Sequence, residues 1–462
     1  MAGRHRHVGG GPVRAAPGFA DVLRVRPFAA LLGSELVSQG GDQIARLALA
    51  VLVYDRSHSP ALTAATFAVT YLPWLLAGPL LSGLGDRFPR RTVLVTSDLL
   101  RVVLAGLLAV PGMPVWALLV LVFLLICGEA PFTSARAALL PEVLQGDAYV
   151  VGHSLQNALS PLVNVLGFAV GGILVAAVGP GPALLLDAAS FLVSAVVLRA
   201  FLPRSPHPTL SAPPVAGEGR FRRPRTGWSV VVGNPQARWV LVFAASVLAF
   251  DTVGVALAVP WAAELGRGST AAGLISAAGP VGAAVGGLVL ARAVPADARV
   301  RLLPWLGLLT VAPQVLFLLH PGLAPLLVIM VVAGLGAGCQ VVANQLFVLA
   351  VPAEHRSKAF GIAGAVLMVG QGSAILGAGL LAQTLRTSTV VGLAGVAGTG
   401  LVAALWASRP ALGGLLTAAR EPVAARDATT GQDPASDPRR DIPGQPGAPA
   451  GESARYPAPA RG

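Results

Sequence analysis

The feature that most constrains this chain is a series of twelve apolar runs, each about long enough to cross a lipid bilayer as a helix. The hydrocarbon core is about 30 Å thick and holds no water, so a spanning segment must satisfy its backbone hydrogen bonds internally. Hydrophobic residues make up 54% of the chain and charged residues 12%, with a mean hydropathy of +0.71. We therefore predict an all-α membrane protein. Its expected transmembrane helices are residues 28–53, 61–84, 92–111, 114–134, 150–178, 181–202, 237–260, 269–294, 301–320, 323–350, 358–384 and 388–408.

Positive charge is spread over short loops between the apolar runs. The formal net charge is +12, but no contiguous basic patch forms, so we exclude a nucleic-acid-binding protein. The loops after runs two, four, eight and ten are basic, whereas the intervening loops carry few basic residues. Because basic loops stay on the cytoplasmic side, we predict a multi-pass protein of the inner or plasma membrane with both termini cytoplasmic. We expect no cleaved signal peptide.

The runs form two groups of six, and the second group repeats features of the first. An offset of about 210 residues places Asp42 on Asp251 and Glu129 on Gln340. Such repeats are typical of transporter halves related by an axis along the membrane normal. We predict two six-helix bundles with a cytoplasmic linker and a C-terminal tail, both poorly ordered. The segments are the N-terminal tail (1–27), the first bundle (28–202), the linker (203–236), the second bundle (237–408) and the C-terminal tail (409–462).

The loop after the second run carries a charged motif. Residues 82–91, SGLGDRFPRR, resemble the cytoplasmic loop signature of the major facilitator superfamily, in outline G-x-L-A-D-R-x-G-R-R. The matching residues are Asp86, Arg87, Arg90 and Arg91. The resemblance implies that the acidic residue packs against the start of the eleventh helix, latching the halves together on the cytoplasmic side. We expect Asp98 and Arg101 of the third run to be partners of this motif; the alternative is a loop that only sets topology.

Longer stretches narrow the resemblance. Residues 79–101, 134–144 and 184–195 are similar to the branch of the superfamily that holds enterobactin and macrolide exporters. This likeness is good over runs one to six and loose over the others. In the fifth run, residues 167–172 read GFAVGG, with Phe168 where drug antiporters typically have proline. The glycines predict a face for close helix packing.

A polar stripe runs along one face of the first helix, at the helical spacing i, i+3, i+4, i+7, i+8 and i+11. Its residues are Glu35, Ser38, Gln39, Asp42, Gln43 and Arg46. A charge at the bilayer centre costs about 2.5–3.5 kcal/mol on insertion scales, so these groups need partners or a function. Our candidates for proton coupling are Glu35, Asp42, Arg46, Glu129 and Asp251. Our candidates for the substrate cavity are Gln39, Asn157, Asn164, Gln340 and Asn344.

Two alternatives for these residues stay open. An Asp42–Arg46 ion pair would only pack helices, and the amides would only form hydrogen bonds between helices. Asp187 and Asp251 have no partner that the sequence identifies.

The chain has no constellation typical of an enzyme, a nucleotide site or a metal site, so we predict no enzymatic activity, cofactor or metal. Without a nucleotide site, an ion gradient must supply the energy; a titratable carboxylate in a cavity favours protons, and sodium is the alternative ion. We predict proton-coupled efflux of a hydrophobic or amphipathic small molecule, such as a drug, a macrolide-like product or a siderophore, by a monomer embedded in the lipid bilayer. The alternatives are uptake, lipid translocation, or a membrane sensor or scaffold that does not transport.

Overall fold

The computed structural model describes residues 18–74, 88–203, 224–352 and 355–407. Every regular element in these ranges is a helix, and nine helical segments are long and apolar enough to cross a membrane. The predicted all-α membrane class is therefore confirmed. Asp86 and Arg87 of the loop motif lie outside the described residues, as does the tail 409–462.

The first six predicted runs form the N-terminal half. Its helices are α2 (Arg26–Ser57), α3 (Pro60–Ala68), α6 (Arg90–Leu108), α7 (Val115–Val143), α8 (Asp147–Val178) and α9 (Pro180–Phe201). A short helix, α1 (Phe19–Leu23), precedes them and buries Val22. The second run is described only as far as Trp74. α2 is 32 residues long, and its charged stripe sets it apart from the nine apolar segments.

The other six runs form the C-terminal half. Its elements are α10 (Pro224–Gly233), α11 (Pro235–Ala256), α12 (Ala258–Glu264), α13 (Ser269–Ala293), α14 (Ala296–Val311), the 3-10 helix η1 (Ala312–Leu319), α15 (Leu323–Leu335), the 3-10 helix η2 (Gly336–Gly338), α16 (Cys339–Ala350), α17 (Arg356–Leu381) and α18 (Thr387–Ala407). α10 lies in the linker 203–236, which we expected to be poorly ordered. That expectation is wrong for α10, because Val231 packs into the core of this half.

Three runs of the C-terminal half are not single α-helices. Run seven is divided between α11 and α12, run nine changes into η1, and run ten contains η2 between α15 and α16. At η2 the chain packs tightly on α14, since an added Cβ on Gly336 would lie 2.6 Å from the backbone nitrogen of Thr310. Only glycine fits there without moving a helix.

Side chains and turns define several helix ends. Asn234 Oδ1 accepts hydrogen bonds from the backbone nitrogens of Gln236 (2.9 Å) and Ala237 (3.2 Å) at the start of α11. Such N-caps satisfy donors that have no partner within the helix. Gly179, with φ +83°, forms the tight turn between α8 and α9. These local signals set the lengths of the spanning helices.

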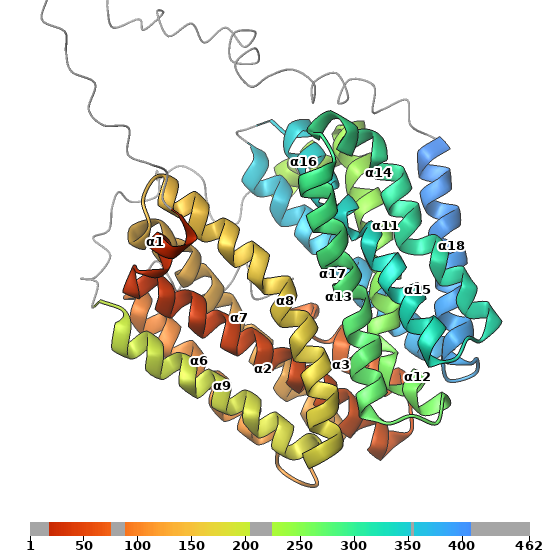
Figure 1. The fold of residues 1–462 in the computed structure, drawn as a ribbon, viewed down its shortest axis with the longest axis horizontal. Coiled ribbons are helices and arrows are strands. Elements are labelled where there is room, and N and C mark those ends of the chain that lie inside the picture. Colours follow the sequence, from red (N-terminus) through yellow and green to blue (C-terminus); the bar gives the residue numbers. More distant parts are fainter. Residues whose placement is uncertain (1–17, 75–87, 204–223, 353–354, 408–462) are drawn as a thin grey trace, which may run out of the picture.

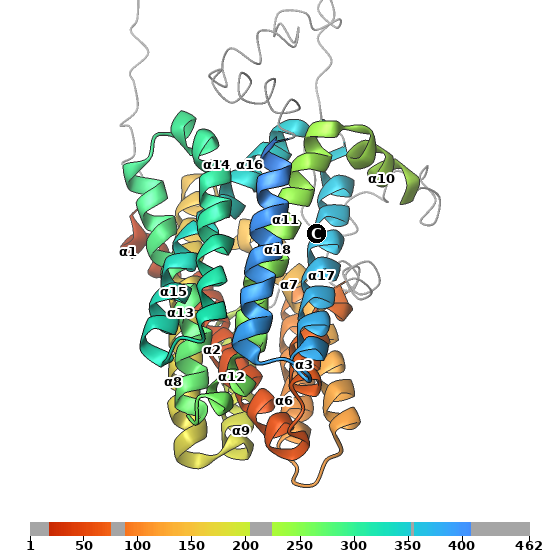
Figure 2. The ribbon, with the colours of Figure 1, turned by 90° about the vertical axis from the view of Figure 1, so that its right-hand side faces the viewer.

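The two halves meet at one end of the molecule and diverge toward the other (Figure 1). Contacts between them are made mainly by α8 with α13 and by α3 with α17. The perpendicular view places α3 and α12 at the end where the halves meet, and α1, α10 and α16 toward the opposite end (Figure 2). We call these the closed end and the splayed end.

Glycines let the halves approach closely near the closed end. An added Cβ on Gly273 of α13 would lie 2.6 Å from the carbonyl oxygen of Phe168 and 2.7 Å from the Cα of Gly172, both in α8. Gly167, also in α8, packs in the same way against Gln43 of α2. The GFAVGG face thus provides the close packing that its small residues predict.

Candidate functional site

The polar stripe of α2 is divided among three neighbouring helices rather than facing a single cavity. Glu35 pairs with Arg136 of α7 and accepts a hydrogen bond from Gln156 Nε2 of α8 at 2.9 Å. Four residues further along the chain, Gln39 begins the amide contacts with α8, and Asp42 contacts α6. Glu35 and Asp42 therefore belong to different sites, although the sequence places them on one helix face.

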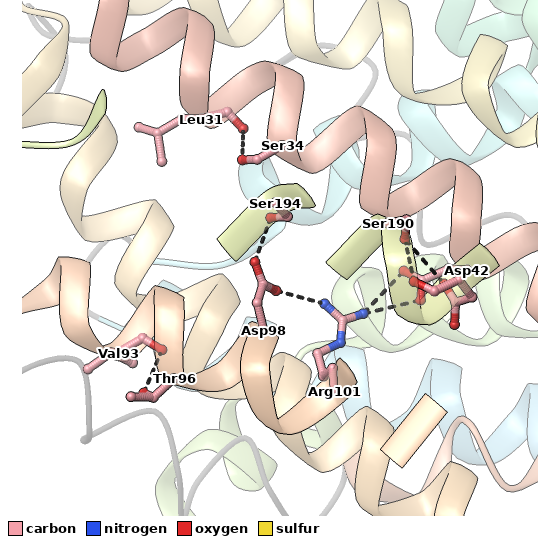
Figure 3. Close-up of polar contacts among 10 residues, drawn as sticks. Leu31, Ser34, Asp42, Val93, Thr96, Asp98, Arg101, Ser190 and Ser194 are labelled. Atoms are coloured by element: carbon pink, nitrogen blue, oxygen red, sulfur yellow. Dashed lines mark hydrogen bonds and ion pairs between the residues drawn. The ribbon is translucent and has the colours of Figure 1, made fainter. Parts of the chain in front are cut away.

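Arg101 of α6 is the centre of the main buried charge network (Figure 3). Its Nη2 donates to both carboxylate oxygens of Asp42 at 3.2 Å, and its Nη1 lies 3.7 Å from Oδ1 of Asp98. The ring of Phe191 covers the guanidinium, with Cζ 3.9 Å from the ring centroid. Arg101 is 2% exposed and Asp98 is fully buried, so their charges interact far from bulk water.

The α9 helix supplies the other side of this network. Ser194 donates a hydrogen bond to Asp98 Oδ2 at 2.5 Å. Asp187 is 1% exposed and lies where α9 comes closest to α2, with its Oδ1 2.7 Å from the position of a Cβ on Gly41. The close approach of α2 and α9 at Gly41 brings Asp187 into the same cluster.

Carboxylates outnumber arginines in this cluster. Asp42, Asp98, Glu129 and Asp187 all act electrostatically on Arg101, and Arg46 acts on Asp187. Four carboxylates against two guanidinium groups leave a formal charge of −2 when all are ionised. A net charge held away from water is costly, so the excess carboxylates of this cluster need a compensating partner or proton.

A small cavity adjoins the network inside the N-terminal half. Its volume is about 40 Å³. The lining includes three charged residues, Asp42, Arg46 and Asp187, and two threonines, Thr66 in α3 and Thr70 in the turn that follows. This volume is large enough for a water molecule. Among the described residues no group of histidines, cysteines and carboxylates could hold a metal ion.

The predicted cavity amides have different surroundings. Gln39 and Gln43 both donate to Asn164 Oδ1 at 3.0 Å, which ties α2 to α8. Gln340 donates to the carbonyl oxygen of Ala244 in α11 at 3.0 Å, and both Asn157 and Asn344 are exposed. Of the five predicted cavity amides, three therefore form the hydrogen bonds between helices of the alternative interpretation: Gln39, Asn164 and Gln340. The other two, Asn157 and Asn344, are accessible.

Asp251 of α11 is separate from the arginine network. Within the part of the chain that the structure describes, it has neither an ion pair nor a hydrogen bond. Asp251 and Arg46 both interact electrostatically with the phenol group of Tyr71, which lies in the turn after α3. Asp251 therefore lies near the boundary between the halves, whereas its repeat partner Asp42 lies inside one half.

The described part of the loop motif contacts the N-terminal half. Arg90 pairs with Glu142 and donates to the carbonyl oxygen of Ala138 at 2.9 Å, and Arg91 donates to the carbonyl oxygen of Arg199. Asp98 and Arg101, which we expected to be partners of this motif, contact Ser194 and Asp42 among the described residues, whereas Asp86 and Arg87 lie outside that part of the chain. The structure also pairs Asp42 with Arg101 instead of Arg46, which removes the basis for the simple ion-pair alternative.

Sequence reasoning missed three members of the site. It left Asp187 open, and it named neither Ser194 nor Phe191. Their only sequence signal is position: Asp187, Phe191 and Ser194 recur at i, i+4 and i+7, on one face of α9. A single sequence does not say which helix that face meets.

Known proteins match both the sequence and the fold. Residues 31–254 match the family model of the Major Facilitator Superfamily, a family of transporters rather than enzymes. The uncharacterized MFS-type transporter YfiS of Bacillus subtilis (strain 168) is 30% identical over 175 residues, which cover 38% of this chain and 42% of that protein. A second protein of that strain, the uncharacterized MFS-type transporter YkuC, is 26% identical over 195 residues, which cover 39% of this chain and 42% of that protein. The chain thus spans 42% of the length of each.

Solved transporters share the fold over nearly the whole chain. A nucleoside transporter, NupG, gives a TM-score of 0.65 at 11% identity and covers 82% of this chain and 98% of its own. A bacterial homologue of the iron transporter ferroportin, in an inward-facing state, gives a TM-score of 0.61 at 15% identity. The match covers 84% of this chain and 98% of the homologue. The peptide transporter POT in complex with sulfate gives 0.64 at 15% identity, covering 84% and 95%. At these identities the likeness shows the fold alone, which is the predicted arrangement of two helix bundles.

Proposed function

We propose that this chain is a secondary active transporter of the major facilitator superfamily that exports a hydrophobic or amphipathic small molecule in exchange for protons. The observation that carries the proposal is the excess of carboxylates over arginines around Arg101, where Asp98 and Asp187 are buried. A cluster whose neutral form needs protons changes its charge whenever a proton is bound or released. It can therefore couple proton movement to a change in helix packing.

The geometry supports a specific exchange of partners. Arg101 joins Asp42 of α2 to Asp98 of its own helix, and Asp187 of α9 lies nearby. Protonation of Asp42 removes its attraction for Arg101, which then interacts with the other carboxylates. Because α2 packs on both α8 and α9, a shift of α2 reaches the contact between the halves. Proton binding would thus bias which end of the transporter is closed.

Orientation follows from the basic loops. With both termini cytoplasmic, the splayed end faces the cytoplasm and the closed end faces outward. This arrangement is the inward-facing state of an alternating-access cycle.

Export rather than uptake rests on the resemblance to enterobactin and macrolide exporters. The polar stripe of α2 mixes carboxylates and amides with a single arginine, which suits amphipathic molecules better than multiply anionic nutrients. Phe168 replaces the proline typical of drug antiporters, but α8 contains Pro161 seven residues earlier. A proline inside a helix favours a bend, so Pro161 offers α8 a bending position in place of residue 168.

The coupling test uses purified protein in vesicles that contain a pH-sensitive dye. A panel of macrolides, siderophores and hydrophobic drugs is added, and proton release is recorded. We expect Asp42→Asn to retain downhill movement of the active compound and to lose export against its gradient. Asp147→Asn is the matched control, since Asp147 is exposed and lies outside the network.

Each other outcome contradicts part of the proposal. Uphill export by Asp42→Asn would place proton coupling elsewhere. A wild-type protein that takes an external nutrient into cells, and releases no protons with the panel, is an uptake permease. No proton movement with any compound would favour a sensor or scaffold.

A further inference from the structure

An apolar pocket lies between the two halves, beside the contact of α3 with α17. Its volume is about 380 Å³, within the range of small-molecule sites. The lining residues come from both halves: Ala65, Ala68, Val69, Tyr71, Leu72 and Leu119 from one, and Met368, Val369, Gly372, Ser373 and Leu376 from the other.

The rim of this pocket is exposed although it is apolar. Leu72, Val369 and Leu376 are 48%, 52% and 44% exposed. On spanning helices such side chains face hydrocarbon, because the core of the bilayer surrounds them. The pocket is therefore open toward the membrane interior, and an apolar molecule can enter it without crossing water.

The lining of the pocket is polar at two positions, Tyr71 and Ser373, and the Ser373 hydroxyl already donates a hydrogen bond to the carbonyl oxygen of Val369 on its own helix. The half-buried Tyr71 contributes a phenol hydroxyl. Arg46 and Asp251 both interact electrostatically with this group. The two charges have opposite sign, one from each half, so the site has no strong preference for an anion or a cation. A neutral or zwitterionic head group suits this end of the pocket.

We propose that this pocket binds the apolar part of the transported molecule, an amphipathic compound with a neutral or zwitterionic head that enters from the bilayer. The inference rests on the proposed transport function and adds the substrate class and the route of entry. The head would lie at Tyr71, near Arg46 and Asp251, and the hydrocarbon portion would lie between α3 and α17.

The packing beside the pocket links its occupancy to the transport cycle. Toward the closed end, an added Cβ on Gly379 of α17 would lie 2.5 Å from Cβ of Ala64, and Gln383 donates to Ser59 Oγ at 3.3 Å across the halves. The pocket begins directly next to this seal. Opening of the closed end must separate α3 from α17, which also pulls the two walls of the pocket apart and releases its contents.

The test measures binding directly, with a medium-chain alkyl glucoside that carries a diazirine at the end of its chain. The full-length protein in phosphatidylcholine vesicles is illuminated with increasing probe, and labelled residues are located by mass spectrometry. We expect saturable labelling at Ala65 to Leu72 and at Met368 to Leu376. Gly372→Leu should weaken this labelling about tenfold in apparent affinity. An added Cβ there lies 3.8 Å from Ala68 and Tyr71, so the leucine fills the pocket without a backbone clash.

Gly377→Leu is the matched control on the same helix. Its Cβ would meet nothing within 4 Å, and Gly377 does not line the pocket. Equal labelling of the two variants, or labelling that never saturates and is as strong at the exposed Leu380, would show ordinary contact with lipid and overturn the proposal.

A second measurement asks whether the occupant is the transported molecule. The alkyl glucoside should compete with substrate-driven proton release in the wild type and compete about tenfold less well in Gly372→Leu. Saturable labelling without competition would identify a structural lipid site and refute the substrate assignment. A wild type that releases no protons with any compound refutes the transport function instead, because labelling needs neither a gradient nor transport.

Discussion

Gly273→Ala places a methyl group in the contact between α8 and α13 near the closed end. The new Cβ would lie 2.6 Å from the carbonyl oxygen of Phe168, where ordinary contacts begin near 3.4 Å, a shortfall of about 0.8 Å. The opposing atoms belong to the backbone and cannot rotate away. Overpacking of this kind costs about 1–3 kcal/mol, and only the state with a closed outer end bears it. The ratio of this state to the alternative should fall about 5- to 150-fold.

Distances between spin labels at Val150 and Gln345 report the change. Both residues are exposed, Val150 near the start of α8 and Gln345 within α16. In a cysteine-free protein, Gly273→Ala should increase the fraction of short distances, because the splayed end closes when the other end opens. Gly279→Ala is the control on the same helix, since its Cβ would meet nothing within 4 Å. An unchanged distribution in Gly273→Ala, or an equal shift in the control, would refute the role assigned to this contact.

Three further changes test the packing of each half. Arg101→Met should lower the free energy of unfolding by about 3–5 kcal/mol, because it leaves buried carboxylates without a partner. The measurement is thermal stability in detergent, and an unchanged melting temperature would show that these carboxylates are already neutral. Glu264→Gln should cost about 0.5–2 kcal/mol, because the Glu264 carboxylate accepts bonds from the nitrogen and hydroxyl of Thr387 at the start of α18. Thr387→Val removes the hydroxyl donor but keeps the backbone donor, so it should cause a smaller loss of the same sign. Gly286→Leu should abolish monodisperse protein by pushing α13 from α15, whereas Gly287→Leu, with open space at its Cβ, should behave as the wild type.

The spanning helices could be predicted because their signals are local. A run of apolar residues with a charged or glycine-rich boundary is enough, and each predicted run coincides with helical structure in the described residues. The interruptions could not be predicted in the same way. The glycines of GLGAG at 334–338 are compatible with a straight helix, and only the contact of Gly336 with α14 explains the 3-10 turn there.

The candidate site was harder to predict because its members are far apart in the chain. Asp42 and Arg101 are separated by 59 residues, and Ser194 lies 96 residues from its partner Asp98. The sequence marks each charge as costly in a membrane, which predicts a partner or a function for Asp42, but it does not say which helix faces which. Arg46, one turn from Asp42, was the only partner that helical spacing could suggest.

The 3-10 segments give the two halves unequal stiffness. A 3-10 turn in the middle of a helix has weaker hydrogen-bond geometry and marks a hinge, and η1 and η2 interrupt two adjacent runs of the C-terminal half. In the N-terminal half, α7 and α8 continue unbroken for 29 and 32 residues. During the proposed transport cycle the N-terminal half would thus turn as a rigid lever. The deformation would be absorbed by the other half, which flexes at Gly336–Gly338.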